Sequence, residues 1–335
     1  MPGSPVEREV KLAVDDDFVV PDLSRFEDLG SAAIVEKLAP LELTATYYDT
    51  VDLRLLRAGV TLRHRRGDTA GDGTWTLKLP AGGRGGSPAG AGATFDRHEL
   101  DWSGAADVMA PEALDLVVGL RQRRPLTEVA VVHTLRARLA VRRADGSAAL
   151  EIDDDRVTAT TGAASVRFRQ VEVERTAGDP ILVEAVAGGL CRAGARPGPA
   201  QPKVAQILAD RLAALTPVLP APRRAESTMG EVTAAALSSA LERLVSHDPG
   251  VRLGRDPEAV HQARVAIRRL RADLSMLRGV LDDTWVARVR DELRGLAAVF
   301  GQVRDADVLV GRLEAYRPSL RPSEIDGFDR LIGRL

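Results

Sequence analysis

The stretch VEREVKL, residues 6–12, lies near the start of the chain and alternates in the manner of a β-strand. Successive side chains of a strand point to opposite faces, so Glu7, Glu9 and Lys11 share one face. Many strands have one polar face because that face meets water. This stretch alone is therefore compatible both with a solvent-facing strand and with a strand that lines a charged interior.

Further strands with paired charges are predicted along residues 1–215. The strand patterns are at 6–12, 44–50, 59–66, 74–79, 95–102, 128–141, 148–155 and 166–175, and helical patterns fall near 24–38, 107–120, 180–193 and 202–215. The charged side chains of these strands share a face, and apart from the strand of Arg97 the acids and bases segregate by strand. The groups are Arg63 with Arg65, Lys78 alone, Arg97 with Glu99 and Asp101, Arg136 with Arg138, Glu151 with Asp153 and Asp155, and Glu172 with Glu174.

If these faces converge, the sheet closes around a charged interior, and an eight-stranded barrel has an interior of small-ligand size. Burying so many charges without a ligand is costly. Clustered carboxylates are explained by a divalent cation, and clustered Arg and Lys suit a chain of phosphates. The residues therefore predict a tunnel that holds a metal and a polyphosphate.

The composition restricts the class of protein. A length of 335 residues favours two domains, and 44% hydrophobic residues suffice for folded cores. The net charge of −2 argues against general affinity for nucleic acids or membranes. Cys191 is the single cysteine, and the sequence shows neither a signal peptide nor a membrane-spanning run. We expect a cytoplasmic protein with no membrane partner and no specific nucleic-acid partner; its oligomeric state is open.

Residues 6–207 resemble the CYTH family, the triphosphate tunnel metalloenzymes. The resemblance rests on an ordered series of motifs: Glu-x-Glu-x-Lys at 7–11, YYDTVDLRLLRAGVTLRHRR, WTLKLP, RHEL, EIDDDRV, VEVE and QPKVAQIL. Lys11, Lys78 and Lys203, three of only four lysines in the chain, fall on family positions. Gln170 stands where related sequences often have a third Glu, and we expect it to be peripheral.

The resemblance implies an enzyme, a Mg²⁺- or Mn²⁺-dependent triphosphatase that cleaves inorganic triphosphate or short polyphosphate. Its catalytic residues would be Glu7, Glu9, Lys11 and Lys78, and its metal ligands Glu7, Glu9, Asp153, Glu172 and Glu174. The phosphate-binding residues would be Lys11, Arg63, Arg65, Lys78, Arg97, Arg136, Arg138 and Lys203. Arg97 either touches the substrate or pairs with Glu99. We interpret His64, His98 and His133 as exterior residues without a metal or acid–base role.

Residues 229–335 have helical periodicity throughout. In the segment 260–277, Ala263, Ile267, Leu270, Leu274 and Leu277 form an apolar stripe. Beside it lies a basic stripe that is either a solvated face or a grip for a linear polyanion; its residues are His261, Arg264, Arg268 and Arg271. With the segment GQVRDADVL, which contains Arg304, this region resembles a CHAD domain, and the resemblance implies polyphosphate binding by these five residues.

The predicted fold class is α+β: an eight-stranded antiparallel β-barrel (tunnel) with flanking helices, followed by an all-α helical bundle. The expected division is a tunnel domain at 1–215, a Pro-rich linker at 216–228 and a CHAD-like domain at 229–335 that contains one basic helix, the first half of such a module. Three alternatives stay open: a non-catalytic polyphosphate-binding protein, a class IV-type adenylate cyclase, and a thiamine triphosphatase.

Overall fold

The computed structural model describes residues 6–23, 26, 34–68, 71–80, 94–142, 148–162, 164–176, 180–199, 201–215 and 228–334. The chain divides into two compact units, Met1–Thr216 and Pro217–Leu335. The predicted linker lies outside the described residues except for Thr228. None of the helices in the described ranges combines the length and the apolar character needed to cross a membrane.

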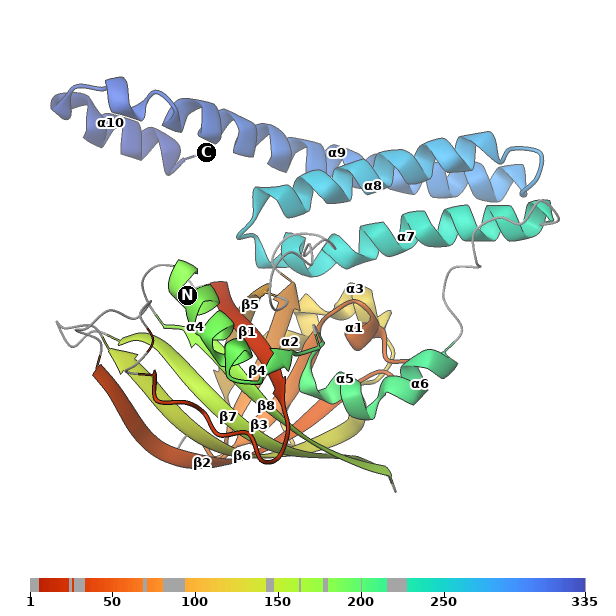
Figure 1. Cartoon of the computed structure of the whole chain (residues 1–335). Coiled ribbons are helices and arrows are strands. Elements are labelled where there is room, and N and C mark those ends of the chain that lie inside the picture. Colours follow the sequence, from red (N-terminus) through yellow and green to blue (C-terminus); the bar gives the residue numbers. More distant parts are fainter. Residues whose placement is uncertain are drawn as a thin grey trace. The chain divides into compact units, whose positions relative to one another are not determined.

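The first unit is built on an antiparallel sheet with the strand order β5-β4-β3-β2-β6-β7-β8-β1-β9 (Figure 1). Each predicted strand is present, and most bounds agree with the pattern of the sequence to within two or three residues. The strands are β1 Val6–Val14, β2 Ile34–Asp49, β3 Thr61–Arg66, β4 Thr74–Pro80, β5 Thr94–Ser103, β6 Thr127–Arg142, β7 Ala148–Thr161, β8 Ala164–Arg175 and β9 Arg196–Pro197.

The observed sheet differs from the expected eight-stranded barrel. The described sheet has nine strands, because the two residues of β9 add to the edge of β1 through Leu12 and Ala13. The sheet also curls far enough for β1 to pair partly with β5, Val6–Val10 against Thr94–His98. The architecture is thus a curled antiparallel sheet that brings distant strands around one concave face.

Strand β2 is longer than its pattern predicted. A helix was expected near 24–38, but Ile34 already pairs with Arg142, and β2 continues along β6 to Asp49; residues 24–33, apart from Phe26, lie outside the described part. The long β-ladder with β6 overrides a weak helical periodicity, since each added pair satisfies backbone groups.

Short helices accompany the sheet. They are α1 Arg54–Arg57, α2 Pro111–Leu116, α3 Val118–Arg121, α4 Pro180–Arg192, α5 Lys203–Ile207 and α6 Ala209–Ala214. All but α1 lie close to where the sequence predicted them, and α5 packs on the concave face, where Val204 clusters with Tyr47 and Ala130. Val10 and Leu12 of β1 pack with Val186 and Leu190 of α4 in one buried apolar cluster. Because side chains alternate along a strand, this packing turns Glu9 and Lys11 to the opposite, concave face.

The second unit is helical: α7 Met229–Leu253, α8 Pro257–Met276, α9 Asp283–Glu314, a 3₁₀ turn at Arg317–Ser319, and α10 Pro322–Ile332. A Thr228–Glu231 capping box begins α7, and the side chain of Asp256 accepts a hydrogen bond from a backbone N–H in the first turn of α8. The apolar stripe of α8 is buried as predicted at its first four positions, while Leu277 is half-buried.

Candidate functional site

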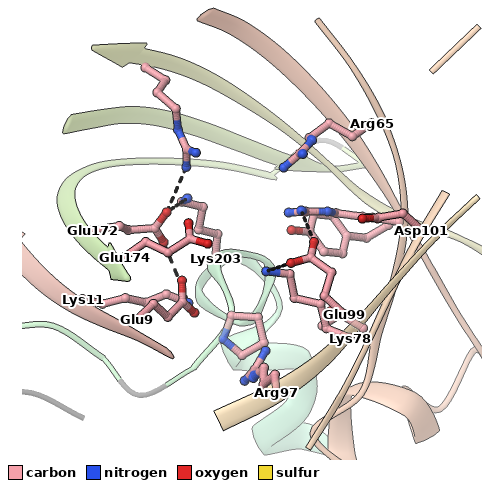
Figure 2. Close-up of a pocket in the computed structure, with 15 residues that line it drawn as sticks. Glu9, Lys11, Arg65, Lys78, Arg97, Glu99, Asp101, Glu172, Glu174 and Lys203 are labelled. Carbon is pink, nitrogen blue, oxygen red and sulfur yellow. Dashed lines mark hydrogen bonds and ion pairs between the residues drawn. The ribbon is translucent and has the colours of Figure 1, made fainter. Parts of the chain in front are cut away.

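The concave face of the sheet holds a cavity of about 270 Å³. Seven cationic and five acidic side chains line it, so the lining as a whole is almost entirely polar. The lining residues are Glu9, Lys11, Tyr47, Thr61, Arg63, Arg65, Lys78, Arg97, Glu99, Asp101, Arg136, Glu172, Glu174, Pro202 and Lys203. Figure 2 shows Glu9, Glu172 and Glu174 on one side, with Lys78, Glu99 and Asp101 opposite.

The opening motif lies on the acidic side. Glu9 and Lys11 are each 6% exposed, and the Lys11 Nζ lies 2.9 Å from the Glu9 Oε1. Burial raises the pKa of Glu9, but the charges of Lys11 and Lys78 outweigh burial and hold this pKa below its usual value. The carboxylate therefore stays charged inside the protein. Glu7 lies on the same strand, but its side chain falls outside the described part of the structure.

The opposite wall consists of β3, β4 and β5. Glu99 lies between two cations, since its Oε2 is 3.1 Å from the Lys78 Nζ and its Oε1 is 3.6 Å from the Arg63 Nη2. Burial and the neighbouring Arg63 lower the pKa of Arg65, whose Nε is buried without a hydrogen-bond acceptor among the described residues. Crowded cations with unmet donors favour the binding of an anion.

The wall formed by β6, β7 and β8 has the densest charge. The Arg136 guanidinium donates to Asp155 through Nε (2.7 Å) and Nη2 (2.8 Å), and Nη2 also donates to Glu172 at 2.9 Å. Lys203 donates to the same two carboxylates at 2.6 and 2.9 Å. Burial raises the pKa of Glu172, but Lys203, Lys11 and Arg136 hold it well below the usual value.

Two predicted site residues lie beside the cavity rather than in its lining. Arg138 donates from its Nε to the Glu151 Oε1 at 2.6 Å. Asp153 is 4% exposed and contacts Arg136, and burial raises its pKa to about 7 although Arg136 opposes this shift. The register explains both positions, because Arg138 and Asp153 face each other in the β6–β7 ladder.

Gln170 is not peripheral, as the sequence had suggested. Its side chain is buried, and its Nε2 donates a 2.8 Å hydrogen bond to the Glu172 Oε1. The alternation of β8 could have shown this, since residues two apart share a face. Tyr47 and Thr61 also line the cavity and were missed, because nothing in their type or spacing distinguishes them from ordinary strand residues.

The histidines also differ from expectation in part. His64 is buried, packs edge-on against Trp75, and its Nε2 lies 2.9 Å from the Gly104 carbonyl oxygen. His133 is exposed, as predicted, and its Nδ1 lies 3.0 Å from the Thr44 hydroxyl. Neither residue is among those lining the cavity. His64 was misassigned because the outer face of β3 is covered rather than solvated.

Divalent-metal ligands are available in the cavity as carboxylate oxygens, the donors that Mg²⁺ and Mn²⁺ prefer. Glu9, Glu172 and Glu174 all reach the cavity. Among the side chains that the structure describes, however, no three acidic, histidine or cysteine residues are gathered as a preformed metal site. The residue types fit such an ion, while the predicted five-ligand set is not assembled as one cluster within the described part.

In the helical unit, the five predicted polyphosphate-binding residues lie on α8 and α9. Arg268 is exposed, and His261, Arg264, Arg271 and Arg304 are half-buried. A side chain added at Gly301 of α9 would meet the Arg264 Nη1 at 2.9 Å, so this glycine leaves room for the guanidinium. The basic stripe of α8 therefore borders α9 rather than standing apart from it.

Two family models match the chain. The model for the CYTH domain matches residues 6–192, and that for the CHAD domain matches residues 235–335. The uncharacterized proteins Rv2226 and MT2285 of Mycobacterium tuberculosis are each 31% identical over 347 residues. The match includes 97% of this chain, which spans 63% of the length of these relatives.

Solved structures resemble part of the chain weakly. The PH1819 protein of Pyrococcus horikoshii is 17% identical with a TM-score of 0.37, over 61% of this chain and 99% of that one. A putative adenylate cyclase of Bacillus halodurans is 17% identical with a TM-score of 0.40, over 60% and 96%. A putative adenylyl cyclase of Hippeastrum, described as having a dominant triphosphatase activity, is 16% identical with a TM-score of 0.36, over 62% and 98%.

Proposed function

Because this chain belongs to the CYTH family and carries a CHAD domain after its CYTH domain, we propose that its cavity hydrolyses inorganic triphosphate or short polyphosphate with the help of Mg²⁺ or Mn²⁺. Members of the family are triphosphatases or cyclases and are in general metal-dependent. The observation that carries the proposal is the cavity lining, in which cations outnumber acids by two, seven against five.

The wall formed by β3, β4 and β5 has cationic side chains that suit a triphosphate substrate. A triphosphate presents several anionic oxygens in a row, and Arg63, Arg65 and Lys78 present donors from two neighbouring strands. Phosphoryl transfer depends chiefly on positioning and on stabilising charge in the transition state. These side chains would therefore bind the phosphate chain and neutralise the charge that develops on the leaving phosphate.

The acidic side suits the metal. Glu9 and Glu174, with Glu7 on the same strand as Glu9, would hold the ion. When bound, the metal would acidify a water molecule and neutralise phosphate oxygens. Lys11, 2.9 Å from Glu9, would keep the carboxylate oriented and place a further positive charge beside the substrate. The lining contains little apolar surface for an organic group, which favours an inorganic substrate over a nucleotide.

The helical unit would bind a longer polyphosphate. His261, Arg264 and Arg268 lie on one side of α8 at helical spacing, and planar guanidinium groups match phosphate oxygens. We expect this binding to supply affinity for long chains rather than chemistry.

A phosphate-release assay tests the proposal, with inorganic triphosphate, long polyphosphate, ATP and thiamine triphosphate, each with and without Mg²⁺ or Mn²⁺. We expect triphosphate to be cleaved fastest and only with metal. The variant Glu9→Ala should lose at least ~100-fold in rate, whereas Glu42→Ala, which changes an exposed acid of β2, should not.

Other outcomes would identify the alternatives. Cyclic AMP formed from ATP would identify a cyclase, and preferential cleavage of thiamine triphosphate would identify that substrate. Tight binding of triphosphate without turnover of any substrate would leave a binding protein.

A further inference from the structure

One acidic side chain of the cavity lining differs from the others in its exposure to solvent. Of the fifteen lining residues, all of which the structure describes, Asp101 alone is exposed, whereas the others are buried or half-buried. An exposed residue in the lining of a cavity marks the place where the cavity opens to water. Asp101 therefore lies at the mouth, on the same side as Glu99 and across from Glu174 (Figure 2).

The hydrogen bond that orients Asp101 comes from a neutral group. The Thr76 hydroxyl donates to the Asp101 Oδ1 at 2.7 Å, and Thr76 itself is fully buried. By contrast, Glu9 and Glu99 each lie within 3.1 Å of a lysine Nζ. A hydroxyl can hold a carboxylate in place, but it carries no charge with which to neutralise it. Asp101 thus presents a negative charge in a fixed position at the mouth.

The β-ladders place this acid beside side chains that would bind phosphate. Asp101 pairs with Thr76 between β5 and β4, and Thr76 pairs with Arg63 between β4 and β3. Two residues along the same ladder, Glu99 pairs with Lys78. Residues two apart on a strand share a face, so all these side chains except Thr76 line one wall of the cavity. A phosphate chain held by Arg63 and Lys78 that continued to the mouth would meet the carboxylate of Asp101.

A site can select a ligand by repelling the wrong one as well as by attracting the right one. A chain that ends inside the cavity avoids Asp101, whereas a longer chain that passes out through the mouth brings like charges together. We propose that Asp101 is a specificity-determining residue that restricts the cavity to short phosphate chains. The inference deepens the proposed function, on which it rests in taking a phosphate chain as the ligand of the cavity.

The test compares chain lengths on the full chain. Isothermal titration calorimetry without metal gives the Kd values of inorganic triphosphate and of linear pentaphosphate. The ratio of the pentaphosphate Kd to the triphosphate Kd should fall about 5-fold in Asp101→Asn, the effect of removing one unit-charge repulsion close to water. Asp101→Lys, which reverses the charge, should lower the ratio further.

Steady-state kinetics with Mg²⁺ report on the cavity alone, because the helical unit supplies no chemistry in the proposed function. The ratio of kcat/KM for pentaphosphate to kcat/KM for triphosphate should rise in Asp101→Asn by the same factor of about 5. If Asp101→Asn fails to fold, Asp101→Ser removes the same charge and takes its place in both measurements.

Two further variants are matched to this one. Asp107→Asn changes another exposed acid, which follows β5 but does not line the cavity, and it should leave both ratios within about 2-fold of the wild type. Thr76→Val keeps the shape of the side chain but removes the hydrogen bond to Asp101. It should shift both ratios in the same direction as Asp101→Asn by a smaller factor, because the carboxylate is then no longer held at the mouth.

The outcomes separate this inference from the proposed hydrolysis. Ratios in folded Asp101→Asn that match the wild type in both measurements would overturn the inference, even if triphosphate is cleaved. Loss of Mn²⁺ affinity in Asp101→Asn, measured by electron paramagnetic resonance, would also overturn it, since Asp101 would then be a metal ligand. A changed Kd ratio with no turnover by the wild type would uphold the role of Asp101 and remove the hydrolysis. A wild type that binds neither phosphate chain would overturn both proposals.

Discussion

Glu172 stays ionised in a nearly dry position because three donors surround it. Lys203, Arg136 and Gln170 each donate to its carboxylate within 2.9 Å. Its pKa is lowered in the folded protein, so the ionised form stabilises the fold at pH values above the usual value of 4.5, and this stabilisation is lost as the pH falls. Asp153 has the opposite sign, since its pKa is raised to about 7 and its contribution is lost as the pH rises.

We therefore expect the free energy of unfolding to be more sensitive to acid in the wild type than in Glu172→Gln. The difference in free energy of unfolding between the wild type and Glu172→Gln should be largest near pH 7. It should decrease by roughly 1–3 kcal/mol between pH 5 and pH 3. Urea unfolding followed by far-ultraviolet circular dichroism measures the difference. Glu42→Gln, an exposed acid, is the control; a constant gap between wild type and Glu172→Gln across this range would contradict the assignment.

Lys78 offers a test of whether the wall formed by β3, β4 and β5 binds the substrate, with another lysine as a matched control. It lines the cavity 3.1 Å from Glu99, whereas Lys37 is exposed on β2. Lys78→Ala should lower kcat/KM for triphosphate by about 100-fold, the usual effect of removing one charge-stabilising donor. Lys37→Ala should stay within about 2-fold of the wild type. Steady-state phosphate release compares them, and similar losses in both variants would argue for a general electrostatic effect.

At the scale of elements, the position of β1 depends on close backbone contact with the segment after β9. The Gly198 N–H donates to the Lys11 carbonyl at 2.9 Å, and a Cβ at Gly198 would lie 2.8 Å from that oxygen. Backbone cannot yield to such an overlap as a flexible side chain can. The glycine therefore lets β1 approach closely enough to set Glu9 and Lys11 in the cavity wall.

Gly198→Ala should lower the free energy of unfolding by about 1–3 kcal/mol through this overlap and should reduce triphosphate turnover. Gly295→Ala, in α9 with open space around the added methyl, should be neutral or stabilising by up to about 1 kcal/mol. Chemical denaturation of both variants measures their free energies of unfolding. A Gly198→Ala protein as stable and active as the wild type would mean that β1 tolerates displacement.

At the scale of the whole molecule, the division into two compact units suggests a division of labour. If the helical unit only anchors long chains, residues 1–216 alone should cleave triphosphate with kcat/KM within about 3-fold of the full chain, since the cavity lies wholly within them. For long polyphosphate, the fragment's KM should rise at least 10-fold, a loss of about 1.4 kcal/mol in binding. Kinetics on both substrates measure this, and an unchanged KM for long polyphosphate would remove the anchoring role.

The sequence by itself determined the eight longer strands of the described sheet and which of their side chains share a face, because alternation is a local property with a period of two. It also indicated the family, since the motifs follow one another along the chain in a fixed order. It did not reveal β9, whose two residues carry no pattern, nor the early start of β2, where pairing with β6 overrides local propensity.

Only the tertiary structure decided which charged side chains pair with each other. Arg136 and Arg138 are equivalent in the sequence, yet one lines the cavity and holds three carboxylates while the other pairs with Glu151 beside it. Gln170 looked peripheral and proved to be a buried donor to Glu172. These contacts join residues from different strands and from α5, so they depend on register, strand order and the burial that strengthens each ion pair, none of which is encoded in spacing along a single strand.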